Sequence, residues 1–380
     1  MRVIMISTDR NIFTKESAVA QRMIEYGKVL GELHIIILSL ARSGFEPFSL
    51  SPEVKIHPTQ SPSRLKYIGD AIFIGEAIAR QLYFGETVIS AQDPFETGIV
   101  GVYLKRKTKF PLQIQIHTDL FTREFYDGSL LNWLRFQISR FTLKKANRVR
   151  VVREKIGRDV ALYRKVDPKI ITVLPIFVDV EALRAKPITV DLKKKYSQFA
   201  KIVLMASRLT SEKRVRVGIE VFANTAKIIP DLGMVIVGSG EEEGDLKKLV
   251  KKLGLENRVC FETWQQDISS YYKTADLFFN TSLFEGYGLT LAEAAAVGCP
   301  VLTTRVGIAI DFFHDGRDAL ICPQGDVQCF SNKMITFFSN SAMKKSIGSA
   351  AFELMSDVRM THQAYLDKYK KALESMIVYK

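Results

Sequence analysis

The chain of 380 residues has no long uncharged apolar run and few cysteines. No such run approaches the ~20 residues that a membrane-spanning helix needs, and the chain opens on a strand-like segment rather than a signal peptide. The cysteines, Cys260, Cys299, Cys322 and Cys329, have no C-x-x-C spacing and lie in or beside apolar segments. We therefore expect buried free thiols in a reducing compartment, not a disulfide or a zinc site, and a cytoplasmic protein.

The composition is that of a folded globular protein, with 47% hydrophobic and 25% charged residues. Wholesale disorder is therefore excluded. The length is comfortable for two domains, each large enough to have its own hydrophobic core. Strand-like segments alternate with helical ones from the beginning: residues 3–7 and 34–40 read as buried parallel strands on either side of a helix over 17–30.

The most informative stretch is 284–294, in which Glu285 and Glu293 are separated by seven residues. It follows the apolar segment 276–279, which we expect to be a strand. Glycines allow a tight bend between the two glutamates, and strong helix formers follow. The stretch therefore predicts a strand, a glycine-rich turn and a helix that begins near Leu289.

A helix that begins there leaves the backbone amides of Gly288, Leu289 and Thr290 without intrahelical partners, at the carboxyl end of a strand. Such a group of amides suits a phosphate. The two glutamates are then placed to hold different hydroxyl groups of one extended ligand. In the alternative interpretation, Thr290 and Glu293 form a capping box, and the glutamate only bonds the first amide of its own helix.

Two further segments carry charged side chains or glycines directly after a strand-like segment. Arg208 follows a strand-like segment that ends at Ala206, Lys213 comes five residues after Arg208, and the next strand-like segment ends in a turn with Gly238 and Gly240. An arginine fork and a lysine charge can neutralise a diphosphate without a metal. The chain also lacks a D-x-D motif, whose carboxylates usually hold a bridging divalent ion. We therefore expect metal independence and no cofactor.

These three motifs, in this order over residues 200–325, resemble those of the retaining nucleotide-sugar glycosyltransferases of family four, the glycosyl transferases group 1 with an E-x7-E motif. The resemblance implies the α/β GT-B fold, in which two doubly wound Rossmann-like domains face a central cleft and the C-terminal helix returns to the first domain. It also implies transfer of a hexose from a UDP- or GDP-sugar to a glycan or lipid-linked acceptor, in cell-envelope polysaccharide or glycolipid synthesis.

By this resemblance, Glu293 holds ribose hydroxyls and Glu285 holds hexose hydroxyls. His117, at the end of a strand-like segment, matches a family histidine that reaches the outer hydroxyls of the donor sugar. The family needs no protein base, so Glu285 positions the substrate and does not attack it. The implied catalytic residues are Glu285, His117, Arg208 and Lys213, and the implied donor-binding residues are Arg208, Lys213, Gly238, Gly240, Glu285, Gly288, Leu289, Thr290 and Glu293.

The resemblance and the strand–helix alternation together divide the chain into two domains. We expect residues 1–178 with the C-terminal helix 360–380 to form the N-terminal acceptor-binding domain, and residues 188–356 to form the nucleotide-sugar-binding domain. The loop 8–13 lacks the Gly-Gly pair that family members usually have there. A charged side chain, Arg10 or Lys15, is the candidate substitute.

The excess of positive charge is concentrated in the first half. Lys and Arg outnumber Asp and Glu by ten over residues 1–190 and by three over the remainder. No nucleic-acid motif accompanies this charge, so a nucleic-acid partner is not expected. Between residues 132 and 165 basic side chains are interleaved with aromatic ones, which suits peripheral docking on the anionic inner face of the cell membrane. A solvated helix face is the alternative.

Other functions stay open on the sequence alone. A GT-B phosphorylase or a nucleotide-sugar epimerase is the enzymatic alternative, although the chain is short for the former. From another class, the chain could be a catalytically weak GT-B scaffold that binds a membrane or an assembly partner through its basic half.

Overall fold

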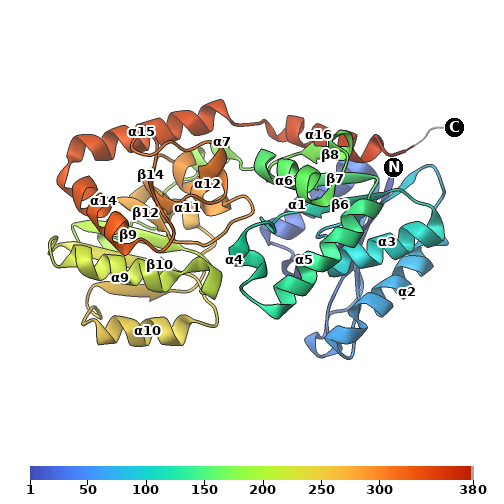
Figure 1. The fold of residues 1–380 in the computed structure, drawn as a ribbon, viewed down its shortest axis with the longest axis horizontal. Helices are drawn as coiled ribbons and strands as arrows, with labels where there is room; N and C mark the ends of the chain where they lie inside the picture. Colours follow the sequence, from blue (N-terminus) through green and yellow to red (C-terminus); the bar gives the residue numbers. More distant parts are fainter. Residues whose placement is uncertain (378–380) are drawn as a thin grey trace. The chain divides into compact units, whose positions relative to one another are not determined.

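The computed structural model describes residues 1–377, which divide into two compact units. Within the described residues, the first comprises Met1–Pro175 and residues 361–377, and the second comprises Ile176–Met360. Each unit is a sheet of parallel strands, with one antiparallel edge strand in the first unit, and helices cover it, the architecture expected of a doubly wound α/β domain (Figure 1).

The sheet of the first unit has eight strands in the order β3-β4-β2-β1-β5-β6-β7-β8, and only β3 is antiparallel to its neighbour. Strands β1 and β2 are largely apolar because helices cover both faces, whereas β6 and β7 alternate apolar residues with polar ones that are mostly buried as well. The strands are β1 (Arg2–Ser7), β2 (Glu32–Ile37), β3 (Phe48–Ser51), β4 (Val54–Pro58), β5 (Thr87–Ala91), β6 (Leu112–Ile116), β7 (Arg148–Val151) and β8 (Ile171–Val173).

Helices connect the strands of the first unit. The C-terminal helix α16 packs against α1, the first helix of the chain. The Ser17 hydroxyl accepts from Ala20 N and so caps the first helix at the residue where the sequence predicts its start. The last three positions of the predicted helix 360–380 lie outside the described residues. The helices are α1 (Ala18–Leu30), α2 (Tyr67–Ala79), α3 (Glu96–Thr108), α4 (Arg123–Tyr126), α5 (Leu130–Thr142), α6 (Glu154–Arg164) and α16 (His362–Glu374).

The sheet of the second unit has six parallel strands in the order β11-β10-β9-β12-β13-β14. Strand β9 lies between β10 and β12, so the strand order reverses direction at β9. In open α/β sheets, ligands bind at the carboxyl ends of the strands beside such a switch point. The strands are β9 (Lys201–Ala206), β10 (Leu232–Val237), β11 (Val259–Glu262), β12 (Leu277–Asn280), β13 (Val301–Thr304) and β14 (Leu320–Cys322).

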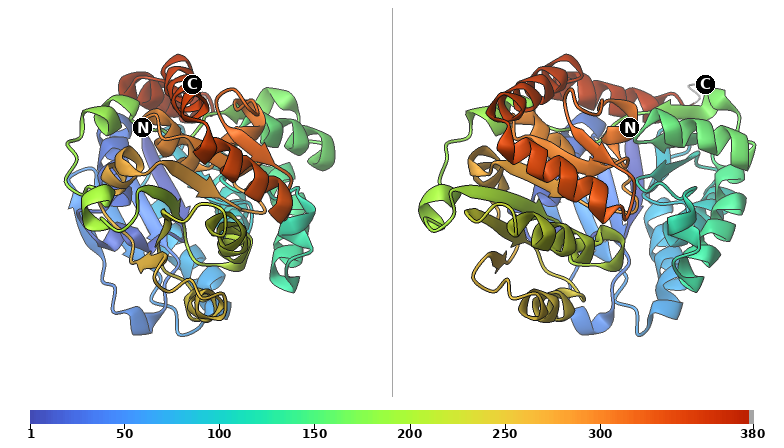
Figure 2. Two further views of the ribbon diagram at one scale, coloured as in Figure 1. Left: turned by 90° about the vertical axis from the view of Figure 1, so that its left-hand side faces the viewer. Right: turned by 60° about the vertical axis from the view of Figure 1, so that its left-hand side comes forward.

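Two hydrophobic clusters, one on each face of this sheet, form the core of the second unit. Helices α9 and α14 pack together over one face, as Figure 2 shows, and α11 and α12 belong to the other cluster. The helices are α7 (Val180–Ala185), α8 (Leu192–Lys195), α9 (Val215–Ala226), α10 (Glu243–Lys252), α11 (Ile268–Thr274), α12 (Leu289–Ala296), α13 (Ile308–Asp311), α14 (Val327–Ser339) and α15 (Ser341–Asp357).

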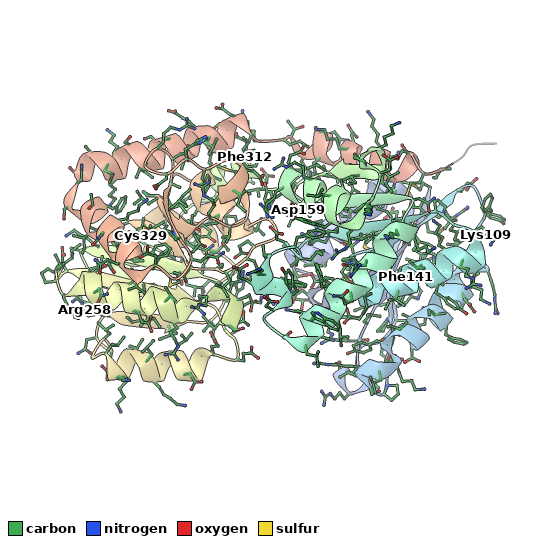
Figure 3. All side chains as sticks on the ribbon, viewed as in Figure 1. Lys109, Phe141, Asp159, Arg258, Phe312 and Cys329 are labelled. Carbon is green, nitrogen blue, oxygen red and sulfur yellow. A yellow bond between two sulfur atoms is a disulfide. The ribbon has the colours of Figure 1, made fainter. Side chains whose placement is uncertain are left out.

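The expectation of four free thiols is wrong for two of them. Cys322 and Cys329 form a disulfide, and Cys260 and Cys299 are free. Cys322 ends β14 and Cys329, labelled in Figure 3, lies in the first turn of α14, which places their Cα atoms 6.0 Å apart. The six intervening residues turn the chain back on itself, a pairing that spacing alone does not reveal.

None of the helices within residues 1–377 is both long and apolar enough to cross a membrane.

Candidate active site

The loop after β9 carries both predicted diphosphate-binding cations. Lys213 ends the short 3-10 helix Ser211–Lys213, and its Nζ lies 2.6 Å from Glu285 Oε1. Each of these two side chains is only 14% exposed. Arg208 is 75% exposed, and its Nη2 lies 3.1 Å from Glu212 Oε1. The structure therefore brings Lys213 and Glu285 together and leaves the Arg208 guanidinium on the surface of the same loop.

Residues directly after β12 hold this pair in place. The Thr281 hydroxyl lies 3.0 Å from the carbonyl oxygen of Lys213 and 2.9 Å from that of Arg214. The Ser282 hydroxyl donates to Glu285 Oε1 (2.8 Å), and the Leu283 amide donates to the carbonyl of Glu212 (2.8 Å). Sequence reasoning missed Thr281 and Ser282, although two hydroxyl residues between a buried strand and Glu285 were the available signal.

Gly238 and Gly240 lie where the turn after β10 packs against the Arg208 loop. A Cβ at Gly238 would lie 1.9 Å from the carbonyl oxygen of Ser207, and one at Gly240 would lie 2.2 Å from that of Leu209. The Leu209 amide also donates to the carbonyl of Ser239 (2.9 Å). Both glycines thus have a structural reason for being there, since they let the two loops approach closely.

Helix α12 begins at Leu289, as the sequence predicts. Its N-cap is Gly288, whose φ of +84° favours glycine, and no side chain caps the helix. Its hydrogen bonds begin with the amides of Leu291 and Ala292, which donate to Gly288 O at 3.0 and 3.1 Å. The helix opening therefore places the amides of Gly288, Leu289 and Thr290 ahead of the intrahelical ladder.

The capping-box interpretation of Glu293 is wrong. Its carboxylate accepts a hydrogen bond from the Tyr272 hydroxyl at 3.1 Å instead of bonding the start of its own helix. Burial raises the pKa of Glu293 to about 7, and the bond from Tyr272 offsets only part of that rise. Glu293 is thus a carboxyl group that changes charge near neutral pH.

His117 belongs to the first unit, one residue after β6, and is half-buried. Its Nε2 lies 3.1 Å from Gln115 Oε1. Burial and the nearby guanidinium groups of Arg150 and Arg22 lower the pKa of His117 to about 3. The turn that follows is fixed by the buried Asp119, which pairs with Arg153 (3.0 Å). His117 is therefore a neutral imidazole beside a turn that a buried ion pair holds.

Arg10 and Lys15 are the candidate substitutes for the Gly-Gly pair that the loop 8–13 lacks. The Arg10 guanidinium donates to the Tyr67 hydroxyl (3.1 Å) and to the carbonyl of Leu38 (3.4 Å), so it ties its loop to neighbouring segments. Lys15 is exposed, with its carbonyl accepting from Gln21 (3.0 Å).

Residues 1–377 contain no group of three or more His, Cys, Asp or Glu side chains that could hold a metal ion.

Solved structures share this fold. The structure of Anabaena Alr3699/HepE in complex with UDP and glucose has a TM-score of 0.79 and 18% identity, with 99% of this chain and 100% of that chain covered. Sucrose-phosphate synthase from Thermosynechococcus elongatus has a TM-score of 0.80 and 19% identity, with 99% of each covered. The fold is that of the GT-B glycosyltransferases.

Curated relatives are similar over part of their length. N-acetyl-alpha-D-glucosaminyl L-malate synthase of Bacillus anthracis is 30% identical over 47% of this chain and 46% of its own. The UDP-Gal:alpha-D-GlcNAc-diphosphoundecaprenol alpha-1,3-galactosyltransferase of Escherichia coli is 28% identical over 53% of this chain and 55% of its own. The chain thus spans about half the length of these relatives.

Two family models match successive parts of the chain. Residues 20–182 match the model described as Glycosyltransferase Family 4, and residues 192–354 match the one described as Glycosyl transferases group 1. Because the two matches follow one another through both units, the chain belongs to glycosyltransferase family four.

Proposed function

We propose that this protein transfers a hexose from a UDP- or GDP-sugar to a glycan or lipid-linked acceptor, in cell-envelope polysaccharide or glycolipid synthesis. The observation that carries the proposal is the Lys213–Glu285 pair, held by Ser282 in the loop before α12. It combines a cation for phosphate with a carboxylate for hydroxyl groups. The names of similar proteins support it, since they include a galactosyltransferase and a structure with bound UDP and glucose.

The proposed chemistry concerns the leaving group. Breaking the bond between sugar and phosphate develops negative charge on the departing diphosphate, which Arg208, Lys213 and the amides at the start of α12 would stabilise. The Lys213 ammonium has three N–H donors, so its bond to Glu285 leaves donors for phosphate oxygens.

We propose retention of anomeric configuration, with the acceptor attacking from the face that the diphosphate leaves. The acceptor proton would then pass to a phosphate oxygen, and no protein base is required. Glu285 would hold hexose hydroxyls, and Glu293 would hold ribose hydroxyls when it is ionised.

We also propose that the reaction is independent of metal ions, because side-chain cations and backbone amides supply the positive charge. Activity that EDTA abolishes and that magnesium or manganese restores would overturn this part of the proposal.

The test of the donor site is a thermal-shift panel with UDP, GDP, ADP and their sugar conjugates in the presence of EDTA. We expect one nucleotide to raise the Tm of the intact chain, because a ligand that binds only the folded state stabilises it. Arg208→Ala should lose this shift. Lys201→Ala is the matched control: Lys201 pairs with Asp231 (2.8 Å) at the amino end of β9, the opposite edge of the sheet from Arg208.

Turnover of the donor identified in this way then separates an enzyme from a scaffold, since a scaffold need not release nucleotide. If no nucleotide raises the Tm and no donor is turned over, the proposed enzymatic function is contradicted and a scaffold function is favoured.

For the acceptor, we propose that the basic, aromatic segment of the first unit docks on an anionic membrane surface. Its large apolar side chains are exposed on α5, among them Leu130 (74%), Trp133 (46%) and Phe141 (55%), the last labelled in Figure 3. Lys144 and Lys145 follow on the surface. Three arginines of the segment do not contribute, because they are buried: Arg150, Arg153 and Arg164.

A further inference from the structure

A file of buried polar side chains lies on one face of the first sheet, an unusual feature in the core of a parallel α/β unit. In the strand register Ser90 lies beside Gln113, and Gln115 lies beside Arg150. All four are buried, with exposures from 0% to 3%. His117 is two residues beyond Gln115 and continues the same face of β6 towards the carboxyl edge. The file thus leads from the core to His117 at the carboxyl edge of the sheet.

Arg150 is a buried cation whose partners are neutral. Its guanidinium donates to Gln115 Oε1 (2.8 Å), to the Tyr365 hydroxyl of α16 (3.0 Å) and to the carbonyls of Leu174 and Pro175 (both 3.3 Å). It also lies over the ring of Tyr369, 5.3 Å from the centroid. No carboxylate within residues 1–377 bonds it. A buried cation without a carboxylate partner is costly, and here hydrogen bonds and tyrosine side chains offset the cost, since they outweigh burial and raise the pKa of Arg150. Such a built environment calls for a reason beyond packing.

The donors and acceptors along the file fix the proton of His117. A guanidinium can only donate, so the Gln115 atom that faces Arg150 must be the carbonyl oxygen, and the amide nitrogen of Gln115 donates to Ser90 (3.0 Å). The same oxygen lies 3.1 Å from His117 Nε2, which must therefore carry a hydrogen. In a neutral ring the other nitrogen, Nδ1, is then an acceptor, and it has no protein partner within residues 1–377.

We propose that Gln115 and Arg150 are positioning residues for glycosyl transfer, which hold His117 as the neutral Nε2–H tautomer so that Nδ1 accepts a hydrogen bond from a hydroxyl group of the bound sugar. This inference rests on the proposed function. Burial, Arg150 and Arg22 on α1 all oppose a positive charge on the ring, since together they lower the pKa of His117. A neutral His117 offers Nδ1 as a hydrogen-bond acceptor and does not act as a general acid at neutral pH.

The first test is NMR of the full chain with ¹⁵N-labelled histidine, in which long-range couplings distinguish the two tautomers without any need for activity. We expect the His117 ring to be neutral at pH 6, with the hydrogen on Nε2. Arg150→Met should raise the pKa of His117, because a neighbouring positive charge is removed. Arg164→Met is the matched control: Arg164 is also a buried arginine with neutral partners, Ser139 Oγ (3.2 Å) and the carbonyl of Phe136 (3.3 Å). It should lower the Tm and leave the His117 signals unchanged.

The second test is a double-mutant cycle in kcat/KM between Gln115→Met and His117→Ala. If Gln115 acts through His117, Gln115→Met should lower kcat/KM about tenfold in the intact chain, as expected for one lost hydrogen bond, and less than twofold in the His117→Ala background. If Gln115 had only a structural role, Gln115→Met would lower kcat/KM by the same factor with His117 present and in the His117→Ala background. Gln115→Met also keeps the inference falsifiable if Arg150→Met does not fold.

Three results would overturn the positioning role: a hydrogen on Nδ1 of His117 in the intact chain, an additive cycle, or an equal change in the His117 pKa in Arg164→Met and Arg150→Met. Absence of turnover with every nucleotide sugar overturns the proposed function and the sugar contact with it. That failure is distinguishable, because the tautomer is read without turnover.

Discussion

At the scale of single residues, the Lys213–Glu285 pair has the strongest consequence for activity. Lys213→Met removes a cation from the proposed diphosphate site and takes the ammonium partner from the Glu285 carboxylate. We expect kcat to fall by about 100- to 1,000-fold, the loss typical of removing one group that stabilises transition-state charge. Initial rates at saturating donor measure this, with circular dichroism to confirm folding.

Lys201→Met serves as the control for that substitution. Lys201 is also an ion-paired lysine of the second unit, but the Lys201–Asp231 pair is one-third or more exposed and contributes at most about 1 kcal/mol. Equal losses of activity in Lys213→Met and Lys201→Met would contradict the assignment of Lys213 to the donor site.

Glu293 predicts a specific dependence of stability on pH. Its pKa is about 7 in the folded protein against 4.5 for the ordinary side chain. Between pH 4.5 and 7 Glu293 therefore holds a proton in the folded state that it has lost in the unfolded chain, so its contribution to the free energy of unfolding should fall as pH rises through this window. The change is on the order of 3 kcal/mol. Urea unfolding of the intact chain and of Glu293→Gln from pH 4.5 to 7.5 should differ by this slope, because His117, His57 and Asp93, whose pKa values are also shifted, titrate alike in both proteins.

Glu262 provides a comparison of opposite sign. Burial alone would raise the pKa of Glu262, but hydrogen bonds from Lys195, Tyr196 and Tyr271 outweigh burial and hold that pKa below its ordinary value. Its contribution to stability is present above pH 4.5 and is lost as pH falls, so Glu262→Gln should leave the slope between pH 4.5 and 7 in place. A slope that persists unchanged in Glu293→Gln contradicts the raised pKa.

At the scale of elements, the turn after β10 is held against the Arg208 loop by close backbone approach. Gly238→Ala places a methyl group 1.9 Å from the Ser207 carbonyl oxygen at a φ of +145°, so the loops must separate. We expect a loss of about 2 kcal/mol or more in unfolding free energy, together with weaker nucleotide binding. Thermal unfolding with and without the donor nucleotide measures both effects.

Gly244→Ala is the control that shows whether replacing any glycine by alanine lowers stability and nucleotide binding as Gly238→Ala should. Gly244 lies near the start of α10, and a Cβ there meets nothing within 4 Å. This substitution should stabilise the protein by about 0.5–1 kcal/mol, because alanine favours a helix more than glycine does. Normal nucleotide binding by Gly238→Ala would argue against a shared role of the two loops in the donor site.

Sequence patterns predicted the elements around the site better than the contacts within it. The strand–turn–helix around Glu285 and the start of α12 follow from apolar runs and glycines, which act locally. The bond of Glu293 to Tyr272 and the disulfide between Cys322 and Cys329 could not be predicted, since each depends on how separate elements pack. The role of Gln115 in fixing His117 was missed for the same reason.

At the scale of the whole molecule, the uneven charge predicts membrane binding through the first unit. The surface lysines that follow α5 should be attracted to a surface of phosphatidylglycerol, into which the exposed apolar residues of α5 should insert. A surface of phosphatidylcholine alone should not bind the chain. Binding should weaken with added salt because the attraction is screened. Vesicle flotation of the full chain measures this, and a chain that stays in solution with phosphatidylglycerol at low salt contradicts the proposal.

Charge reversal tests whether the end of α5 is a docking surface. Each basic residue near an anionic surface contributes about 1 kcal/mol, so exchanging Lys144 and Lys145 for glutamate should lower vesicle affinity by at least 30-fold. The matched control exchanges Lys247 and Lys248 of α10, two exposed lysines of the second unit, for glutamate and changes the net charge equally. If both pairs weaken binding to the same extent, the attraction comes from the charge of the whole molecule and not from a docking surface at the end of α5.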